Sequence, residues 1–249
     1  MIELYQSSPC WGLPDLSPFC IKLHTYFRIA KLPYEVSREL TFQDAPKGKI
    51  PFIRYNGKLI GDSNLIIDYL NKTLEVEPNG NLSKEEKAVS LAFLRLIEEN
   101  LYWVAIYYIY KIEDNWLSYR TILEELILKE FPESIQNQIL EELHDQILKQ
   151  LWGHGMGRHS ESEIYEIGKR DLSALSDFLG DKPFFMGAKA TTLDAAAYGL
   201  LSRLIYDNSQ SLLKEQALKL DNLQRFCQRV RAEFYTEQET KAWNVKVGS

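Results

Sequence analysis

The chain has 249 residues, enough for one large domain or two small ones, each with a substantial core. Hydrophobic residues make up 45% and charged residues 26% of it, a composition typical of folded globular proteins that argues against disorder. The formal net charge of -6 argues against a general nucleic-acid or membrane-surface binder, because both need concentrated positive charge.

The first 75 or so residues alternate strand patterns with helical patterns. Short apolar runs predict strands at 2–6, 34–38, 52–55 and 58–60, and Asn56-Gly57 between the last two is a strong hairpin signal. Helices are predicted at 17–30 and 63–74, with a polar loop at 41–49. The order β-α-β-loop-β-β-α predicts a compact mixed sheet with helices packed on it.

Pro78-Asn79-Gly80 interrupts that pattern and predicts a boundary between a first domain at 1–77 and a second at 82–249. Beyond the boundary only helical spacing is found. One face of a long helix is predicted by Leu91, Leu94, Ile97, Leu101, Val104 and Tyr108. Further helices are predicted within 121–151, with Pro132 as a break, and at 164–179, 191–206 and 221–234. An all-helical second domain is therefore expected.

No targeting or membrane-spanning segment is visible in the sequence. Residues 1–5 lack a basic region followed by an apolar core, and residues 247–249 carry no targeting signal. The longest apolar and aromatic run, 101–110, is too short to span a bilayer and predicts the most buried part of a helix. The three cysteines, Cys10, Cys20 and Cys227, are odd in number and irregularly spaced. They indicate reduced thiols, so a cytoplasmic protein is expected.

Ser17-Pro18-Phe19-Cys20 begins the first predicted helix and has two interpretations. In one, the Ser17 hydroxyl only caps the helix and Cys20 only fills the core. In the other, a hydroxyl at a helix N-terminus just after the first strand lies beside free N–H groups and the positive end of the helix dipole. Both features favour a bound thiolate.

Two further segments have the same double interpretation. Pro51 in Lys49-Ile50-Pro51 is either a structural proline at a strand start or, if its peptide bond is cis, part of a turn that exposes the Ile50 backbone to a peptide ligand. Lys49 would add a charge for a ligand carboxylate. Asp62 or Ser63 either caps the next helix, or Ser63 and the helix start bind a carboxylate while Asp62 pairs with an ammonium group. Together the three segments describe a site for a small thiol peptide, a description that matches glutathione.

Two other segments contain residue types that occur in binding sites. His154 and His159 are five residues apart with no nearby cysteine, so a metal site is disfavoured and a glycine loop before a Ser160–Glu163 capping box is favoured. Arg158 in that loop could reach a ligand carboxylate. The aromatic cluster at 102–110 predicts helix packing, with part of it lining a hydrophobic pocket for a second substrate.

Six motifs in order carry a resemblance to a known family. They are 11–20 (WGLPDLSPFC), 48–52 (GKIPF), 62–63 (DS), 153–160 (GHGMGRHS), 182–187 (KPFFMG) and 191–194 (TTLD). With these motifs the chain resembles the glutathione S-transferase superfamily along nearly its whole length. Within it, the chain most resembles the branch of failed-axon-connections proteins, metaxins and the cadmium-resistance proteins grouped with them.

The resemblance implies a fold and a site. The fold would be an α/β thioredoxin-like N-terminal domain followed by an all-α C-terminal domain. Glutathione would be bound by Lys49, Ile50, Pro51 with a cis peptide bond, Asp62 and Ser63, and Ser17 would be the catalytic contact to the sulfur. Thr191 and Asp194 match the superfamily's buried capping box, which concerns folding and not catalysis.

The chain departs from the family pattern in two ways. Relatives with a redox cysteine carry it at position 17, where this chain has serine, so a Cys-x-x-Cys disulfide cycle is excluded. The segment 8–16 is longer than in most transferases and is a candidate to cover or reshape the thiol site. Tyr5 and Cys10 then compete for the sulfur contact, and the expected order is Ser17, Tyr5, Cys10.

The expected function is a glutathione S-transferase with a detoxification role. It would use glutathione as co-substrate and no metal, and its thiolate would attack a hydrophobic electrophile in a pocket between the domains. No nucleic acid or membrane partner is expected, and a homodimer is left open. The alternative is a non-catalytic transferase-fold protein that acts by protein–protein interaction, because the resembled metaxins act in mitochondrial protein import.

Overall fold

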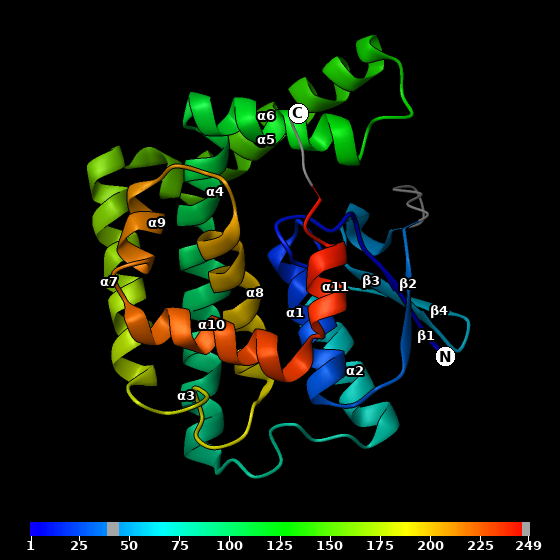
Figure 1. The fold of residues 1–249 in the computed structure, drawn as a ribbon, viewed down its shortest axis with the longest axis vertical. Coiled ribbons are helices and arrows are strands. Elements are labelled where there is room, and N and C mark those ends of the chain that lie inside the picture. The colour runs from blue at the N-terminus through cyan, green and yellow to red at the C-terminus, as the bar shows by residue number, and fades with distance from the viewer. Residues whose placement is uncertain (39–44, 246–249) are drawn as a thin grey trace.

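The computed structural model describes residues 1–38 and 45–245. Four strands and the first helices form a small β/α unit, and the remaining helices form a larger body beside it (Figure 1). The predicted polar loop at 41–49 lies partly outside the described residues, as do residues 247–249. Where it is described, the loop contains a short turn of 3-10 helix, η1 (Pro46–Gly48).

The β/α unit has the predicted order of elements. They are β1 (Ile2–Tyr5), α1 (Pro18–Ile29), β2 (Tyr34–Ser37), β3 (Phe52–Tyr55), β4 (Lys58–Gly61) and α2 (Ser63–Leu74). The sheet order is β2-β1-β3-β4, with β1 parallel to β2 and antiparallel to β3. The predicted hairpin joins β3 and β4, and Asn56 and Gly57 both take the positive φ that its tight turn requires. This is the thioredoxin-like arrangement that the resemblance implied.

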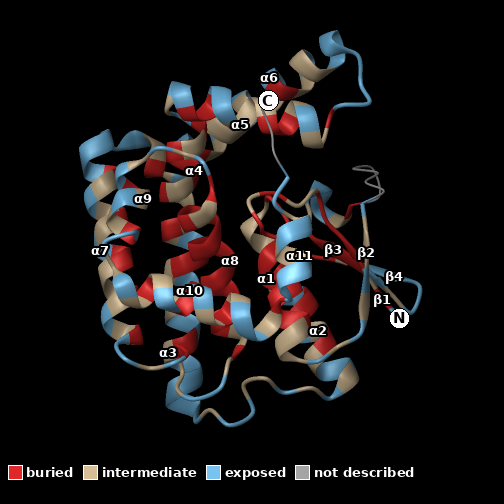
Figure 2. Cartoon of the chain, in the orientation of Figure 1, coloured by how far each residue is buried: buried red, intermediate tan, exposed pale blue. Residues whose placement is uncertain are grey.

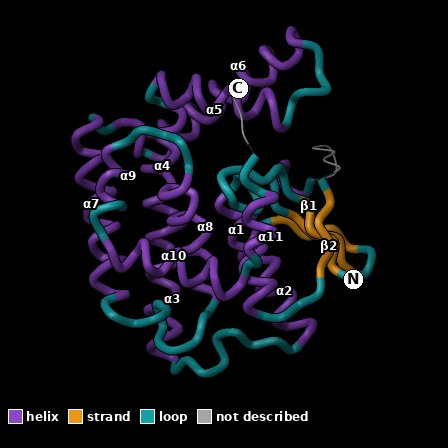
Figure 3. The backbone as a smooth tube through the Cα atoms, in the orientation of Figure 1, coloured by secondary structure: helices purple, strands orange, loops and turns teal. Residues whose placement is uncertain are grey.

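Apolar residues of the sheet and of its two helices form one core. Leu4 and Ile53 from the strands pack with Leu23, Phe27 and Ile66 from the helices, and each of these five side chains is fully buried. Figure 3 shows the strands gathered on one side of the molecule. The sheet therefore presents α1 and α2 toward the helical body.

The second part of the described chain is helical, as predicted. Its elements are α3 (Lys84–Arg95), η2 (Leu96–Leu101), α4 (Tyr102–Tyr110), α5 (Glu113–Leu126), α6 (Glu133–His154), η3 (Met156–Arg158), α7 (Glu161–Leu179), α8 (Thr192–Tyr206), α9 (Leu212–Ala217), α10 (Asp221–Phe234) and α11 (Glu237–Ala242). Pro132 lies in the predicted break, between α5 and α6. We keep a domain boundary near 78–81 as a proposal, and this segment lies between α2 and α3.

The predicted long helix differs from its expectation in two respects. The consecutive helices α3 and α4 are joined by a π-helical turn, η2, which no periodicity indicated. Leu91 is predicted on the buried face, but it is 52% exposed, because the covered face of α3 at this level presents the neighbouring Ser90, which is buried. Burial is high along 101–110, as predicted (Figure 2).

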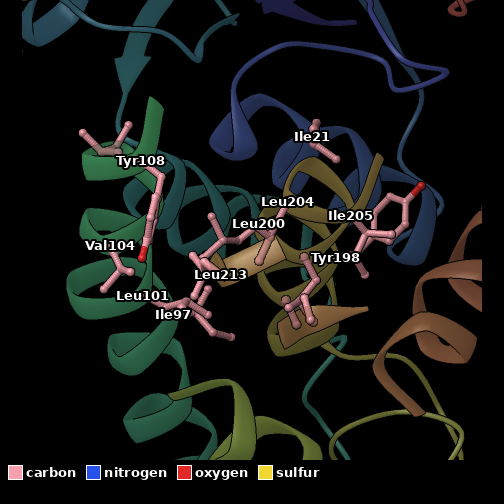
Figure 4. Packing of buried hydrophobic residues seen from close by; sticks show 14 of the residues in the cluster. Ile21, Ile97, Leu101, Val104, Tyr108, Tyr198, Leu200, Leu204, Ile205 and Leu213 are labelled. Carbon is pink, nitrogen blue, oxygen red and sulfur yellow. The ribbon is translucent and has the colours of Figure 1, made fainter. Parts of the chain in front are cut away.

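Helix α8 forms the centre of the helical body and is buried along nearly its whole length. Figure 4 shows Leu200, Leu204 and Ile205 of this helix packed with residues of α1, α4 and α9. Gly199 allows the close contact with α1, because a Cβ at this position would lie 2.4 Å from the carbonyl oxygen of Pro18. The N-terminus of α1 is thus held against the helical body.

The predicted capping boxes are present. The Asp194 carboxylate accepts hydrogen bonds from the N–H groups of Thr191 at 2.8 Å and Phe185 at 2.7 Å. Glu163 accepts one from Ser160 N–H at 2.8 Å. Within residues 1–38 and 45–245, no helix combines the length and apolar character needed to cross a membrane.

Candidate functional site

A cleft of about 440 Å³ opens between the β/α unit and the helical body. The N-terminus of α1, the segment from η1 to β3 and the start of α2 line one side, and η2, α4 and α6 line the other. All six predicted site residues line this cleft: Ser17, Lys49, Ile50, Pro51, Asp62 and Ser63. Three segments separated in sequence therefore meet in one place.

Ser17 occupies the N-cap position of α1 but does not act as a capping residue. Its backbone is extended, as at an N-cap, yet its side chain makes no capping hydrogen bond. Its own N–H donates to Asp15 Oδ1 at 2.7 Å. The interpretation of Ser17 as a plain cap is therefore wrong. The hydroxyl lies at the cleft beside an uncapped helix N-terminus, where the dipole favours negative charge.

The two competitors for a sulfur contact lie elsewhere. Tyr5 is buried and stacks on Phe52, with ring centroids 4.4 Å apart. Cys10 is buried in the core of the helical body, and this burial raises the pKa of its thiol. Neither residue lines the cleft, nor does any other residue of segment 8–16, so that segment does not cover the site.

The segment before β3 has the expected backbone. The Ile50–Pro51 peptide bond is cis, and Pro51 is buried at the cleft wall. Lys49 is exposed at the rim together with Lys47. Two positive side chains therefore stand on this side of the opening.

Two side chains at the start of α2, Asp62 and Ser63, have different roles. Asp62 caps the helix, because its Oδ1 accepts hydrogen bonds from the N–H groups of Asn64 at 3.0 Å and Leu65 at 3.1 Å. Ser63 is buried, and its Oγ accepts a hydrogen bond from Lys22 Nζ at 3.0 Å. The capping interpretation thus holds for Asp62 and not for the Ser63 hydroxyl.

Sequence reasoning missed three residues at the inner end of the cleft. Lys22 of α1 is buried and forms an ion pair with Glu98 of η2 at 2.6 Å. Asn64 of α2 links to both, accepting from Lys22 Nζ and donating to Glu98 Oε2, each at 2.7 Å. The available signal was a charged residue at an apolar position, since Lys22 interrupts a helix that is buried from 20 to 27.

The opposite wall is aromatic and apolar. Tyr102, Trp103 and Ile147 line it beside the polar Glu98, Glu99 and Gln150. Phe19 of α1 meets this wall from the other side, and its ring lies edge to face with that of Tyr102 at 5.0 Å. The aromatic cluster thus divides as predicted: Tyr107, Tyr108 and Tyr110 pack in the core, while Tyr102 and Trp103 line the cleft.

The segment at 153–160 supports this wall from behind. The His154 ring stacks on Trp103 with centroids 4.7 Å apart, and its Nε2 lies 3.0 Å from the Glu99 carbonyl oxygen. Arg158 donates to the Trp152 carbonyl at 3.1 Å and does not line the cleft. Across the described residues, no three His, Cys, Asp or Glu side chains are grouped as metal ligands would be.

Comparison with known proteins gives two family matches. Residues 18–116 match the model described as glutathione S-transferase N-terminal domain, and residues 168–230 match the model described as glutathione S-transferase, C-terminal domain. Among solved structures, a glutathione transferase from Phanerochaete chrysosporium has a TM-score of 0.64 at 16% identity, covering 95% of this chain and 98% of its own. The beta-etherase LigF from Sphingobium sp. strain SYK-6 has a TM-score of 0.63 at 14% identity, covering 97% of this chain and 98% of its own. These structural matches show the fold.

Curated relatives show the family. The chain is 35% identical to the isoprene-epoxide–glutathione S-transferase of Rhodococcus sp. (strain AD45), over 94% of this chain and 99% of that protein. It is 40% identical to failed axon connections of Drosophila melanogaster over 83% of this chain, which spans half of the length of that protein. Metaxin-1 of Mus musculus is 27% identical over 91% of this chain and 73% of its own length. The chain therefore belongs to the glutathione S-transferase superfamily, as a relative of failed axon connections and the metaxins.

Proposed function

We propose that the cleft binds glutathione and that the Ser17 hydroxyl stabilises the glutathione thiolate for attack on a hydrophobic electrophile. The observation that carries the proposal is the position of Ser17. Its hydroxyl lies at the cleft beside the uncapped N-terminus of α1 and is not used as a cap. Relationship to a glutathione S-transferase over nearly the full length of both chains supports the same chemistry.

Each part of the peptide has a matching group in the proposed binding mode. The thiol lies near Ser17, and the γ-glutamyl carboxylate meets the Ser63 hydroxyl and the start of α2. Asp62 keeps a carboxylate oxygen outside its capping bonds, which both use Oδ1, for the ammonium group. Lys49 and the Ile50 backbone meet the remainder of the peptide.

One hydrogen bond from Ser17 is enough to lower the pKa of the bound thiol by the amount that the chemistry requires. A free thiol titrates near 8.5, so only a few per cent is thiolate at neutral pH. A hydrogen bond to a charged group contributes about 1.5–3 kcal/mol, which lowers the pKa of the bound thiol by roughly one to two units. The thiolate then becomes a major species.

The aromatic wall indicates the kind of second substrate. Phe19, Tyr102, Trp103 and Ile147 suit an apolar molecule of modest size. The Rhodococcus relative is named for an epoxide. With an epoxide, the thiolate sulfur bonds to a ring carbon, the carbon–oxygen bond breaks, and the released oxygen takes a proton from water. We propose small epoxides and aryl halides as the first electrophiles to assay.

The test compares Ser17→Ala with the wild-type chain. We expect the pKa of bound glutathione, followed by the ultraviolet absorbance of the thiolate, to rise by about one to two units, with unchanged thermal stability. We expect kcat/KM at neutral pH to fall by about tenfold or more. Ser8→Ala serves as control, because the Ser8 hydroxyl lies in the preceding segment 8–16 and donates to the Leu126 carbonyl away from the cleft. An unchanged thiol pKa and unchanged kinetics in Ser17→Ala would refute the assignment.

The alternative function is partner binding without catalysis. The relationship to failed axon connections and to metaxins favours it. Calorimetric titration with glutathione separates the two functions, since a folded wild-type chain that binds no glutathione at millimolar concentration leaves only partner binding. A cytoplasmic, reducing compartment is part of the enzymatic proposal, supported by three buried cysteines that are not disulfide-bonded.

A further inference from the structure

A buried charged pair lies beneath the cleft, and the proposed chemistry does not use it directly. The side chains of Lys22 and Glu98 are 2% and 6% exposed, and their charged atoms are 2.6 Å apart. Lys22 Nζ also donates to Ser63 Oγ at 3.0 Å and to Asn64 Oδ1 at 2.7 Å. Four side chains from α1, α2 and η2 are thereby joined in one network.

A contribution to stability does not by itself explain why this network is buried here. Removing two charges from water carries a large free-energy penalty, and apolar residues of similar volume often replace a buried ion pair without loss of stability. Burial lowers the pKa of the Lys22 ammonium, while the neighbouring Glu98 carboxylate opposes this shift. A role in the adjacent site explains the pair better.

The hydrogen bond from Lys22 determines how the Ser63 hydroxyl is oriented. An ammonium group has three donors and no acceptor, and Ser63, Asn64 and Glu98 take all three. Lys22 therefore has no donor left for a ligand. Because Ser63 Oγ accepts from Lys22, the Ser63 hydroxyl proton must point to another acceptor, and Ser63 lines the cleft.

Lys22 also influences the cleft by neutralising the charge of Glu98. The Glu98 carboxylate lines the cleft from the π-helical turn η2, close to the place proposed for a ligand carboxylate. Unpaired, Glu98 would repel that ligand and would compete for the Ser63 proton. Paired with Lys22, it is neutralised, and Asn64 occupies its other oxygen. π-Helical turns occur frequently at functional sites, in agreement with such a role.

We propose that Lys22 is a positioning residue that fixes the Ser63 hydroxyl as a donor to a ligand carboxylate and neutralises Glu98 beside it. This proposal rests on the proposed glutathione function, because it concerns the γ-glutamyl end of the same ligand. Lys22 acts through Ser63 and Glu98 and does not itself contact glutathione.

The experiment measures glutathione affinity by calorimetry and thermal stability side by side. Lys22→Met is expected to weaken glutathione binding by about tenfold or more. This variant leaves Glu98 buried and unpaired, so a loss of stability is also expected. The double variant Lys22→Met/Glu98→Met removes both charges, and we expect it to recover the melting temperature but not the affinity. Lys149→Met makes the same change on an exposed lysine of α6 and is expected to bind glutathione as the wild type does.

A double-mutant cycle with Ser63 separates positioning from a structural role. Ser63→Ala alone is expected to weaken binding by about tenfold or more. Adding Lys22→Met/Glu98→Met to Ser63→Ala is expected to cause little further loss, because the hydroxyl that Lys22 orients is already absent. Wild-type affinity in Lys22→Met/Glu98→Met, or fully additive losses in the cycle, would overturn the positioning role while leaving glutathione binding intact. Absence of glutathione binding by the wild-type chain would overturn both proposals together.

Discussion

Asp15 provides a prediction about stability and pH that can be worked out from the structure. Its side chain is fully buried, and its Oδ1 accepts hydrogen bonds from Ser17 N–H at 2.7 Å and Ser7 Oγ at 3.0 Å. Burial, opposed by these hydrogen bonds, raises the pKa of Asp15 to about 7. The ordinary value of 3.8 applies to the unfolded chain.

The sign of the effect follows from these two pKa values. Below about pH 4, Asp15 is protonated in both states. Between about pH 4 and 7 the unfolded chain ionises while the folded chain keeps its proton, so the free energy of unfolding falls as the pH rises. The free energy of unfolding falls by about 4 kcal/mol in total over this range. It falls no further above about pH 7, where Asp15 is ionised in both states.

The variant Asp15→Asn removes this titration and keeps a carbonyl oxygen for the two donors. We expect the free energy of unfolding of Asp15→Asn, relative to the wild type, to increase by up to about 4 kcal/mol between about pH 4 and pH 8. Urea unfolding at several pH values measures it. Asp177→Asn makes the same change on an exposed carboxyl and controls for the loss of a surface charge. Parallel pH profiles for Asp15→Asn and the wild type would show that the buried carboxyl does not hold its proton, and the reasoning would fail.

Two further predictions concern the packing that supports the site. Asp194→Ala leaves the buried N–H groups of Thr191 and Phe185 without their acceptor, so the free energy of unfolding in urea should fall by about 2–4 kcal/mol; an unchanged midpoint would contradict the capping role. Gly199→Ala places a methyl group against the Pro18 carbonyl, so we expect a loss of about 1–3 kcal/mol, seen as a lower melting temperature. An unchanged or higher melting temperature in Gly199→Ala would mean that α1 and α8 separate easily.

Most of the fold could be predicted because it is encoded locally. Asn56-Gly57 fixes a hairpin through its turn geometry, and the change from strand patterns to helical spacing after residue 80 reflects two kinds of local structure. The exposure of Leu91 could not be predicted, because apolar spacing favoured Leu91 for the buried face, whereas the helix buries the adjacent polar Ser90.

The part of the candidate site that has local sequence signals could be predicted, and the part that depends on tertiary contacts could not. Each of the three segments around Ser17, Pro51 and Ser63 carries a local signal for a strand or helix terminus, and the structure brings them to one cleft. The pairing of Lys22 with Glu98 joins residues 76 positions apart, and it depends on how α1 meets a π-helical turn. Local propensity predicts neither that turn nor the absence of a capping hydrogen bond from the Ser17 hydroxyl, because tertiary contacts decide both.

The burial of all three cysteines has a practical consequence for chemical labelling. Cys10, Cys20 and Cys227 are at most 1% exposed, and burial raises the pKa of each thiol. Alkylating reagents attack the thiolate, so the folded chain offers them no ready target. A cysteine introduced in place of Lys49, which is exposed at the rim of the cleft, would be a reachable thiol among buried ones. A fluorophore or spin label attached there would report from the mouth of the cleft without removal of any native cysteine.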